Sequence, residues 1–88
     1  MNRIHETVRG EVSWIDQLIK WSEKNTSKIC HKKICMLIKR GYRIPCPISE
    51  MGHNAVKTLK EAGLVVVIDS LCIISKRMNI ERIIQSEV

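Results

Sequence analysis

The sequence contains no Phe, a single Tyr and only two Trp among its 88 residues. Without aromatic bulk, the interior has to be built mainly from Ile, Val, Leu and Met. A chain of this length buries only about 60–65% of the surface of its unfolded form, so its core is thin. A second copy would cover apolar surface that one chain leaves open. We therefore predict a single domain that forms a homodimer.

Long apolar runs are missing as well. No stretch approaches the roughly 20 apolar residues that cross a bilayer. The start of the chain, MNRIHETVRG, lacks the apolar region of a secretory signal. These absences predict a cytoplasmic protein with no membrane partner. In that compartment the four cysteines, Cys30, Cys35, Cys46 and Cys72, are expected to be reduced thiols.

The usual signatures of a metal site or an active site are also missing. No CxxC pair is present, and on a helix Cys30 and Cys35 would point about 140° apart. No nucleophile–base pair, carboxylate pair or Gly-rich phosphate loop stands out, and His5, His31 and His53 are scattered. The sequence therefore predicts no metal, no cofactor and no enzymatic activity.

One segment, Lys28 to Arg43, has no acidic residue but holds six Lys or Arg. The chain has 15 basic and 9 acidic residues, so this segment accounts for its net charge of +6. A plain solvated surface usually mixes the two signs. The concentration of positive charge indicates a polyanionic partner, for which nucleic acid is the first hypothesis and an acidic protein the second.

Helical periodicity predicts two helices in the first half of the chain. Residues 1–12 are expected to form a flexible arm. Ser13 is a suitable N-cap for a helix to about Lys24, whose apolar side carries both Trp residues. A second helix, from about Lys28 to Arg40, has its apolar residues at i, i+4, i+7 and i+8.

The pattern of the second half predicts a helix that leads directly into a β-hairpin. The third helix is expected from an N-cap at Ser49 to Ala62, with Gly63 as its stop. Because Gly52 and His53 weaken its first turn, the alternative is a helix that begins nearer His53, with Ile48 to Met51 as a separate short turn. The apolar runs LVVVI and LCIIS flank Asp69-Ser70 and predict a hairpin over 64–75. A short C-terminal helix is expected over 79–86. The predicted fold class is mainly α with a C-terminal β-hairpin, an α+β fold, in one domain over 13–88.

The segment HNAVKTLKEAGLVVVIDSLCIISKR, His53 to Arg77, resembles the winged helix-turn-helix domains of transcriptional regulators. Its ending Leu59-Lys60-Glu61-Ala62-Gly63-Leu64-Val65 is similar to the "L-x-x-x-G-L-V" that leads into the wing of such domains. The resemblance covers about a third of the chain by motif and the rest by element order. Two features depart from the family: GYRIPCPI is longer than a usual helix-turn-helix turn, and the hairpin tip carries no Arg or Lys.

This resemblance implies that the third helix enters the major groove. Three residues on its early polar face would contact base edges: His53, Asn54 and Lys57. Basic residues on the second helix and near the hairpin would contact phosphates: Lys28, Lys32, Lys33, Lys39, Arg40, Arg43, Lys60, Lys76 and Arg77. Apolar residues of the hairpin and the last helix are expected to contact a second copy or another partner: Val66, Ile68, Ile73, Ile80, Ile83 and Ile84.

Two functions follow from these features. The first is a small, sequence-specific, dimeric transcriptional regulator that binds double-stranded DNA, of the kind found in phages, plasmids and bacterial accessory regions. The second is a protein-interaction module or inhibitor with a winged-helix-like fold, which would dock through its apolar hairpin or its C-terminal helix. Duplex RNA is a variant of the first hypothesis.

Overall fold

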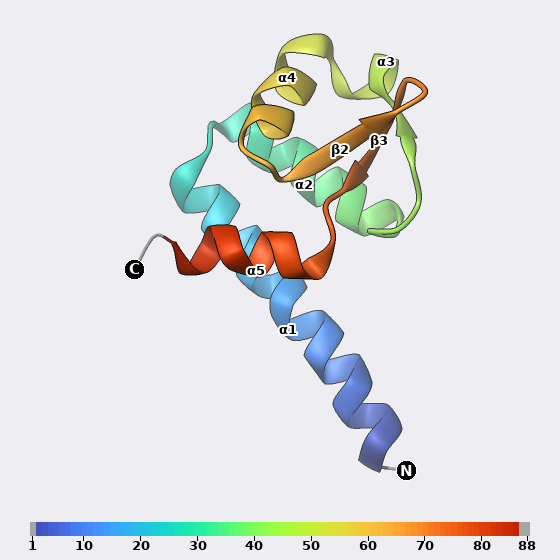
Figure 1. Ribbon diagram of the computed structural model, residues 1–88, viewed down its shortest axis with the longest axis vertical. Coiled ribbons are helices and arrows are strands. Elements are labelled where there is room, and N and C mark those ends of the chain that lie inside the picture. Colours follow the sequence, from blue (N-terminus) through green and yellow to red (C-terminus); the bar gives the residue numbers. More distant parts are fainter. Residues whose placement is uncertain (1, 87–88) are drawn as a thin grey trace.

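The computed structural model describes residues 2–86, and the side chains of residues 13–86. The described chain is mainly helical, with a small antiparallel sheet of three strands (Figure 1). Its elements follow one another as α1 (Asn2–Asn25), α2 (Lys28–Arg40), β1 (Cys46–Pro47), α3 (Ile48–Met51), α4 (His53–Glu61), β2 (Val65–Ile68), β3 (Leu71–Ile74) and α5 (Arg77–Gln85). The predicted α+β class is therefore confirmed at this level.

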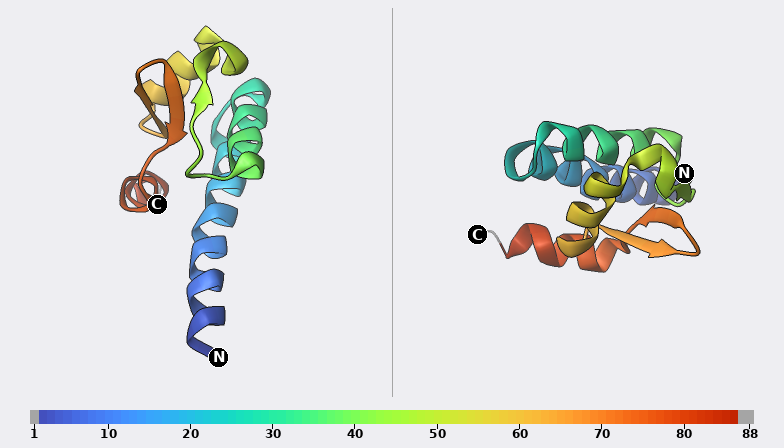
Figure 2. Two further views of the ribbon diagram at one scale, coloured as in Figure 1. Left: turned by 90° about the vertical axis from the view of Figure 1, so that its right-hand side faces the viewer. Right: turned by 90° about the horizontal axis from the view of Figure 1, so that it is seen from above.

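Helices α1 and α2 form a helical hairpin, of which α2 packs against the sheet (Figures 1 and 2). Trp14 and Leu18 on α1 are buried, as their spacing predicts. The start of α2 is capped by Ser27, whose hydroxyl accepts a hydrogen bond from the Cys30 amide at 3.2 Å. The N-cap predicted at Ser13 is wrong, because α1 runs from Asn2 and Ser13 lies inside it. The side chains of the predicted flexible arm, residues 1–12, lie outside the described part.

The proline-containing link after α2 forms two short elements that bring the chain back across the sheet. Its strand is β1 at Cys46–Pro47. Pro47 is tolerated because β1 lies at the edge, paired only with β3. The single turn α3 follows directly, so the helix predicted from an N-cap at Ser49 is wrong. The alternative, a short turn over 48–51 before a helix that begins at His53, is confirmed.

Gly52 separates α3 from α4 and explains why residues 48–61 do not form one continuous helix. Its φ of +90° belongs to a region that glycine enters readily and side-chain-bearing residues avoid. The helix therefore stops at Met51 and starts again at His53, with no side-chain cap on α4. In consequence, His53 and Asn54 are the first two residues of an independent helix.

The sheet has the strand order β1-β3-β2, with both pairs antiparallel. Asp69 and Ser70 connect β2 to β3 and have φ values of 52° and 64°. Two positive φ values are the signature of a type I′ turn, whose twist matches that of the strands. The predicted two-residue turn is thus confirmed. Ser75 ties the hairpin base to the end of α4, since its hydroxyl donates to the Gly63 carbonyl at 2.7 Å.

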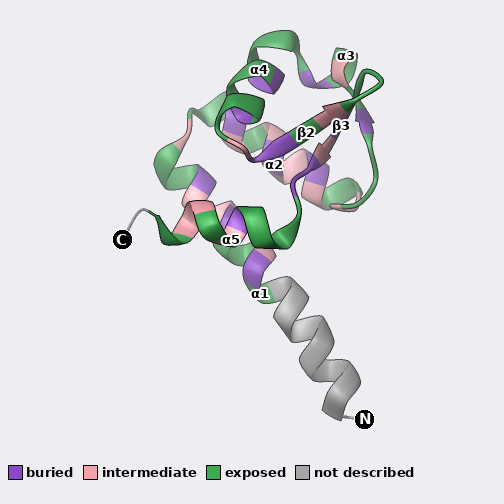
Figure 3. Cartoon of the chain, viewed as in Figure 1, coloured by how far each residue is buried: buried purple, intermediate pink, exposed green. Residues whose placement is uncertain are grey.

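The core lies between the helices and the sheet: α2 and α4 pack against the strands, and α1 packs against α2 and α5 (Figure 3). The last helix begins at Arg77, two residues before its predicted start, and packs across α1. Its residue Ile80 is fully buried. None of the helices in the described part is both long and apolar enough to cross a membrane.

Candidate nucleic-acid interface

Helix α4 divides into a buried face and a polar, solvent-facing one. Ala55, Val56 and Leu59 are buried against the core. The three predicted base-contact residues, His53, Asn54 and Lys57, are all exposed and lie on the opposite side. The structure thus brings these three together on one outward surface. Lys60, from the predicted phosphate set, is exposed one turn after Lys57.

Helix α2 carries a second basic surface, on the side away from the core. Its buried residues are Cys30, Ile34 and Leu37. At about 100° per residue, Lys28, Lys32 and Lys39 lie opposite to these three and within about 40° of one another. All three are exposed, and none has a hydrogen bond or ion pair among the described residues. We call these three residues the α2 lysine stripe.

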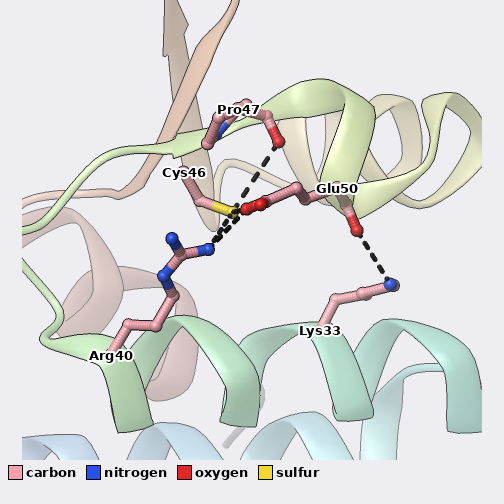
Figure 4. A network of polar contacts seen from close by, with 5 residues as sticks. All are labelled: Lys33, Arg40, Cys46, Pro47 and Glu50. Atoms are coloured by element: carbon pink, nitrogen blue, oxygen red, sulfur yellow. Dashed lines mark hydrogen bonds and ion pairs between the residues drawn. The ribbon is translucent and has the colours of Figure 1, made fainter.

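Two other basic residues of α2, Lys33 and Arg40, lie on the flank that faces α3, where they meet Glu50 (Figure 4). The Glu50 carboxylate is 2.6 Å from Arg40 Nη1. Its backbone carbonyl accepts a hydrogen bond from Lys33 Nζ at 3.2 Å. The basic segment therefore does face an acidic residue, Glu50, which lies ten positions after Arg40 in the chain. Arg40 in particular is engaged within the protein.

Cys46 completes this network from β1. Arg40 Nη1 donates to Cys46 Sγ at 3.1 Å, and the thiol donates to Glu50 Oε2 at 3.3 Å (Figure 4). Burial, followed by the hydrogen bond to Glu50, raises the pKa of Cys46. The hydrogen bond from Arg40 is the main cause that lowers the pKa of Glu50. The network thus holds a neutral thiol beside a carboxylate–guanidinium pair and ties α2 to β1 and α3.

The remaining predicted phosphate contacts lie elsewhere, around an apolar groove between the hairpin and α5. This cavity of about 790 Å³ has Arg43, Lys76 and Arg77 in its lining. Arg43 sits 5.2 Å from the centroid of the Tyr42 ring, and Arg77 pairs with Glu81 at 3.4 Å. The nine predicted phosphate residues therefore do not form one surface.

The predicted partner residues also separate. Val66, Ile68 and Ile73 line the groove, together with Met78. In contrast, Ile80 has no exposed surface because it packs inside the domain, so its predicted partner contact is wrong. Ile83 and Ile84 are half-buried against the core.

The structure brings together two further residues, His31 and Cys35, for which the sequence analysis predicted no function. Their i, i+4 spacing places them on one side of α2, and this spacing is the signal that could have identified the pair. Among the described residues, no group of three or more His, Cys, Asp or Glu side chains is placed to hold a metal ion.

We compared the chain with protein-family models, with curated proteins and with solved structures, and none of the three comparisons gives a match.

Proposed function

We propose that this protein is a small DNA-binding regulator of transcription, in which α4 enters the major groove and basic residues of α2 contact phosphates. The observation that carries the proposal is the outward face of α4. It holds His53, Asn54 and Lys57 together in solvent while the opposite face is anchored in the core. The predicted homodimer remains part of the proposal, since DNA-binding domains of this kind commonly read two half-sites.

The dimensions of α4 suit this role. Its nine residues make a rod about 13.5 Å long. The diameter of such a helix with its side chains, about 10–12 Å, fits the width of the major groove, which is about 12 Å. In helix-turn-helix proteins the first residues of the recognition helix reach the base edges. His53 and Asn54 occupy those positions because the chain breaks at Gly52. An amide such as Asn54 can pair with adenine, and an ammonium such as Lys57 with guanine.

The arrangement around α4 supports the same proposal. A short helix, α3, precedes it across a one-residue break, and the hairpin of β2 and β3 follows it. This order is the one expected of a helix-turn-helix with a wing. The hairpin tip, however, carries the carboxylate of Asp69 and no cation. We therefore assign the hairpin to packing and leave DNA contact to α4 and the α2 lysine stripe.

The test is a salt titration of binding to a mixed-sequence DNA duplex. Each phosphate contact contributes about 0.9 to the slope of log affinity against log salt. Replacing two stripe residues, Lys32→Ala/Lys39→Ala, should lower that slope by about 2 if both contact phosphate.

A matched control removes the same charge from α1, as Lys20→Ala/Lys24→Ala, where both lysines are exposed. This control should change the slope by clearly less than the stripe variant. Equal changes in the two variants would indicate a general charge effect, and absence of salt-dependent binding by the wild type would overturn the proposal.

A second candidate function is supported by the groove. Its lining is largely apolar, with Trp14, Val66 and Ile73. It also holds three cations, Arg43, Lys76 and Arg77, against one carboxylate, that of Glu81, which pairs with Arg77. Pairing two copies groove to groove would bring like charges together. We therefore propose, as the alternative, that the groove binds an acidic amphipathic segment of another protein, in the helix-in-groove manner.

Calorimetry with a synthetic helical peptide, apolar on one face and Glu-rich on the other, tests this alternative. Met78→Glu should abolish binding, because it places a carboxylate in the groove. Ile29→Glu is the control, since Ile29 is similarly exposed, at 65% against 70%, but lies outside the groove. Binding that is absent, or equally weakened by both changes, would exclude the groove as the docking site.

A further inference from the structure

His31 stands between a serine and a cysteine in a chain of three hydrogen bonds. Its Nδ1 lies 2.8 Å from Ser22 Oγ, and its Nε2 lies 3.6 Å from Cys35 Sγ. The Ser22 hydroxyl in turn donates to the Ile19 carbonyl at 2.9 Å. The chain therefore runs from a backbone carbonyl of α1, through Ser22 and His31, to a thiol on α2.

The donor and acceptor roles at His31 depend on its tautomer, and the hydrogen bond from Ser22 to Ile19 favours the tautomer with hydrogen on Nδ1. Ser22 is fully buried, and its only hydroxyl hydrogen is donated to Ile19. Its oxygen can then only accept, so the neutral ring must donate from Nδ1. That leaves the lone pair of Nε2 facing the thiol of Cys35. A base oriented by a third group beside a thiol is the arrangement of an activated nucleophile.

Cys35 is also the accessible thiol of the four. Cys30, Cys46 and Cys72 are buried, whereas Cys35 and His31 are partly exposed. Burial raises the pKa of Cys72 to about 11, and burial raises that of Cys46 as well. Since the thiolate is the attacking species, these two cysteines are poor competitors near neutral pH.

The charge around Cys35 indicates what it would react with. On α2, Lys32 and Lys39 lie three residues before and four residues after it, and Lys28 lies one turn further. These three make up the α2 lysine stripe, which has no acidic neighbour within the helix. An anionic reagent is therefore attracted to this side of the protein.

We propose that Cys35 is a modification site for small disulfides that carry carboxylates, with His31 as its base and Ser22 as a positioning residue. The proton of Cys35 passes to His31 Nε2 while Sγ attacks one sulfur of the disulfide. The old S–S bond breaks as the new one forms, and the leaving thiolate takes the proton from the imidazolium. Cys35 is thereby oxidised to a mixed disulfide, and the departing half of the reagent is reduced to a thiol.

The test follows the reaction of the folded, full-length chain with oxidised glutathione by mass spectrometry and peptide mapping. The adduct should form first on Cys35. His31→Gln, which keeps a hydrogen-bonding side chain but no base, should slow it by about tenfold or more. In His31→Ala, added imidazole should restore part of the rate, an effect that a merely structural role of His31 would not give.

A charge variant keeps the proposal falsifiable if the His31 changes disturb folding. Lys32→Ala/Lys39→Ala should slow the reaction with oxidised glutathione but not that with uncharged hydroxyethyl disulfide. Adduct formation first on a buried cysteine, or a wild-type rate in His31→Gln, would overturn the proposal. The readout is the thiol itself, so it does not depend on DNA binding.

Discussion

Glu50 decides how much of the positive charge on α2 faces outward. Its carboxylate holds Arg40, its carbonyl holds Lys33, and the Cys46 thiol donates to the same carboxylate. Only the cations on the far side of α2 stay open to a polyanion. At the scale of single residues, then, one acidic residue separates the α2 cations that are held within the protein from those that stay available.

Acid should destabilise the protein partly through Glu50. Its pKa in the folded state is lowered from 4.5, chiefly by the hydrogen bond from Arg40. The unfolded chain therefore binds the proton more readily, and this contribution to stability is present above about pH 4.5 and lost as the pH falls through the folded-state value. This contribution is measured by urea unfolding of the wild type and of Glu50→Gln at several pH values.

The variant should lose less of its free energy of unfolding than wild type between neutral and acidic pH. Glu61→Gln serves as the control, because Glu61 is exposed and has no ion pair among the described residues. If Glu50→Gln shows the acid sensitivity of wild type, the ion pair contributes nothing in solution.

The sequence allowed some of the site residues to be predicted and not others. His53, Asn54 and Lys57 follow from helical spacing alone, since the buried residues of α4 recur at the period of a helix. The Glu50 network could not be predicted this way, because it joins α2 to α3 through the turn of the chain at Pro45 and Pro47. The same holds for Ser22, which reaches His31 only after α1 and α2 pack together.

At the scale of elements, the backbone of the hairpin turn is strained. Asp69 and Ser70 both adopt positive φ. In this conformation the side chain comes too close to the backbone, which costs roughly 1–2 kcal/mol per residue. Such turns favour Asn and Gly. The turn forms nevertheless, because β2 and β3 pair over four residues and are held at their base by Ser75.

Ser70→Gly should therefore stabilise the protein. Glycine also raises the conformational entropy of the unfolded chain, which costs about 0.4–1 kcal/mol of stability. The relief of backbone strain is larger, so we expect the free energy of unfolding, measured in urea, to rise by about 0.5 kcal/mol. Ser70→Ala keeps the strain and should give no gain. A loss of stability in Ser70→Gly would mean that the turn differs in solution.

Element boundaries were harder to predict than element types. The sequence predicted the helix at the C-terminus and the hairpin correctly, because their apolar patterns are strong. The break at Gly52 was expected only as an alternative, because the glycine weakens the helix while the helical periodicity continues across it. The positive φ of Gly52 decides between the two versions. The start of α1 differs as well: Ser13 has the chemistry of an N-cap, but α1 runs from Asn2 and Ser13 lies inside it.

At the scale of the whole molecule, the first and the last helix pack against each other. Helix α5 packs across α1, and its residue Ile80 joins the same core as Leu18, Ile34 and Leu59. A single core that includes the last helix implies that the domain unfolds as one unit.

Ile80→Ala should accordingly cost about 2–5 kcal/mol of global stability, the range for truncating a large buried aliphatic residue. The transition should stay single, whether followed by far-ultraviolet or near-ultraviolet circular dichroism. Met78→Ala, on the same helix but 70% exposed, should change stability by less than about 0.5 kcal/mol. Two separate transitions in Ile80→Ala would show that α5 is an independent appendage.

Trp14 gives the groove an optical reporter. Its ring is buried at 3% exposure, meets Tyr42 edge-on with centroids 5.6 Å apart, and forms part of the groove wall. Trp21, the other tryptophan, packs against the core outside the groove lining. An occupant that replaces water beside Trp14 should shift its fluorescence emission while Trp21 stays constant. Occupancy of the groove can therefore be followed on the unlabelled protein, with Trp21→Phe isolating the signal.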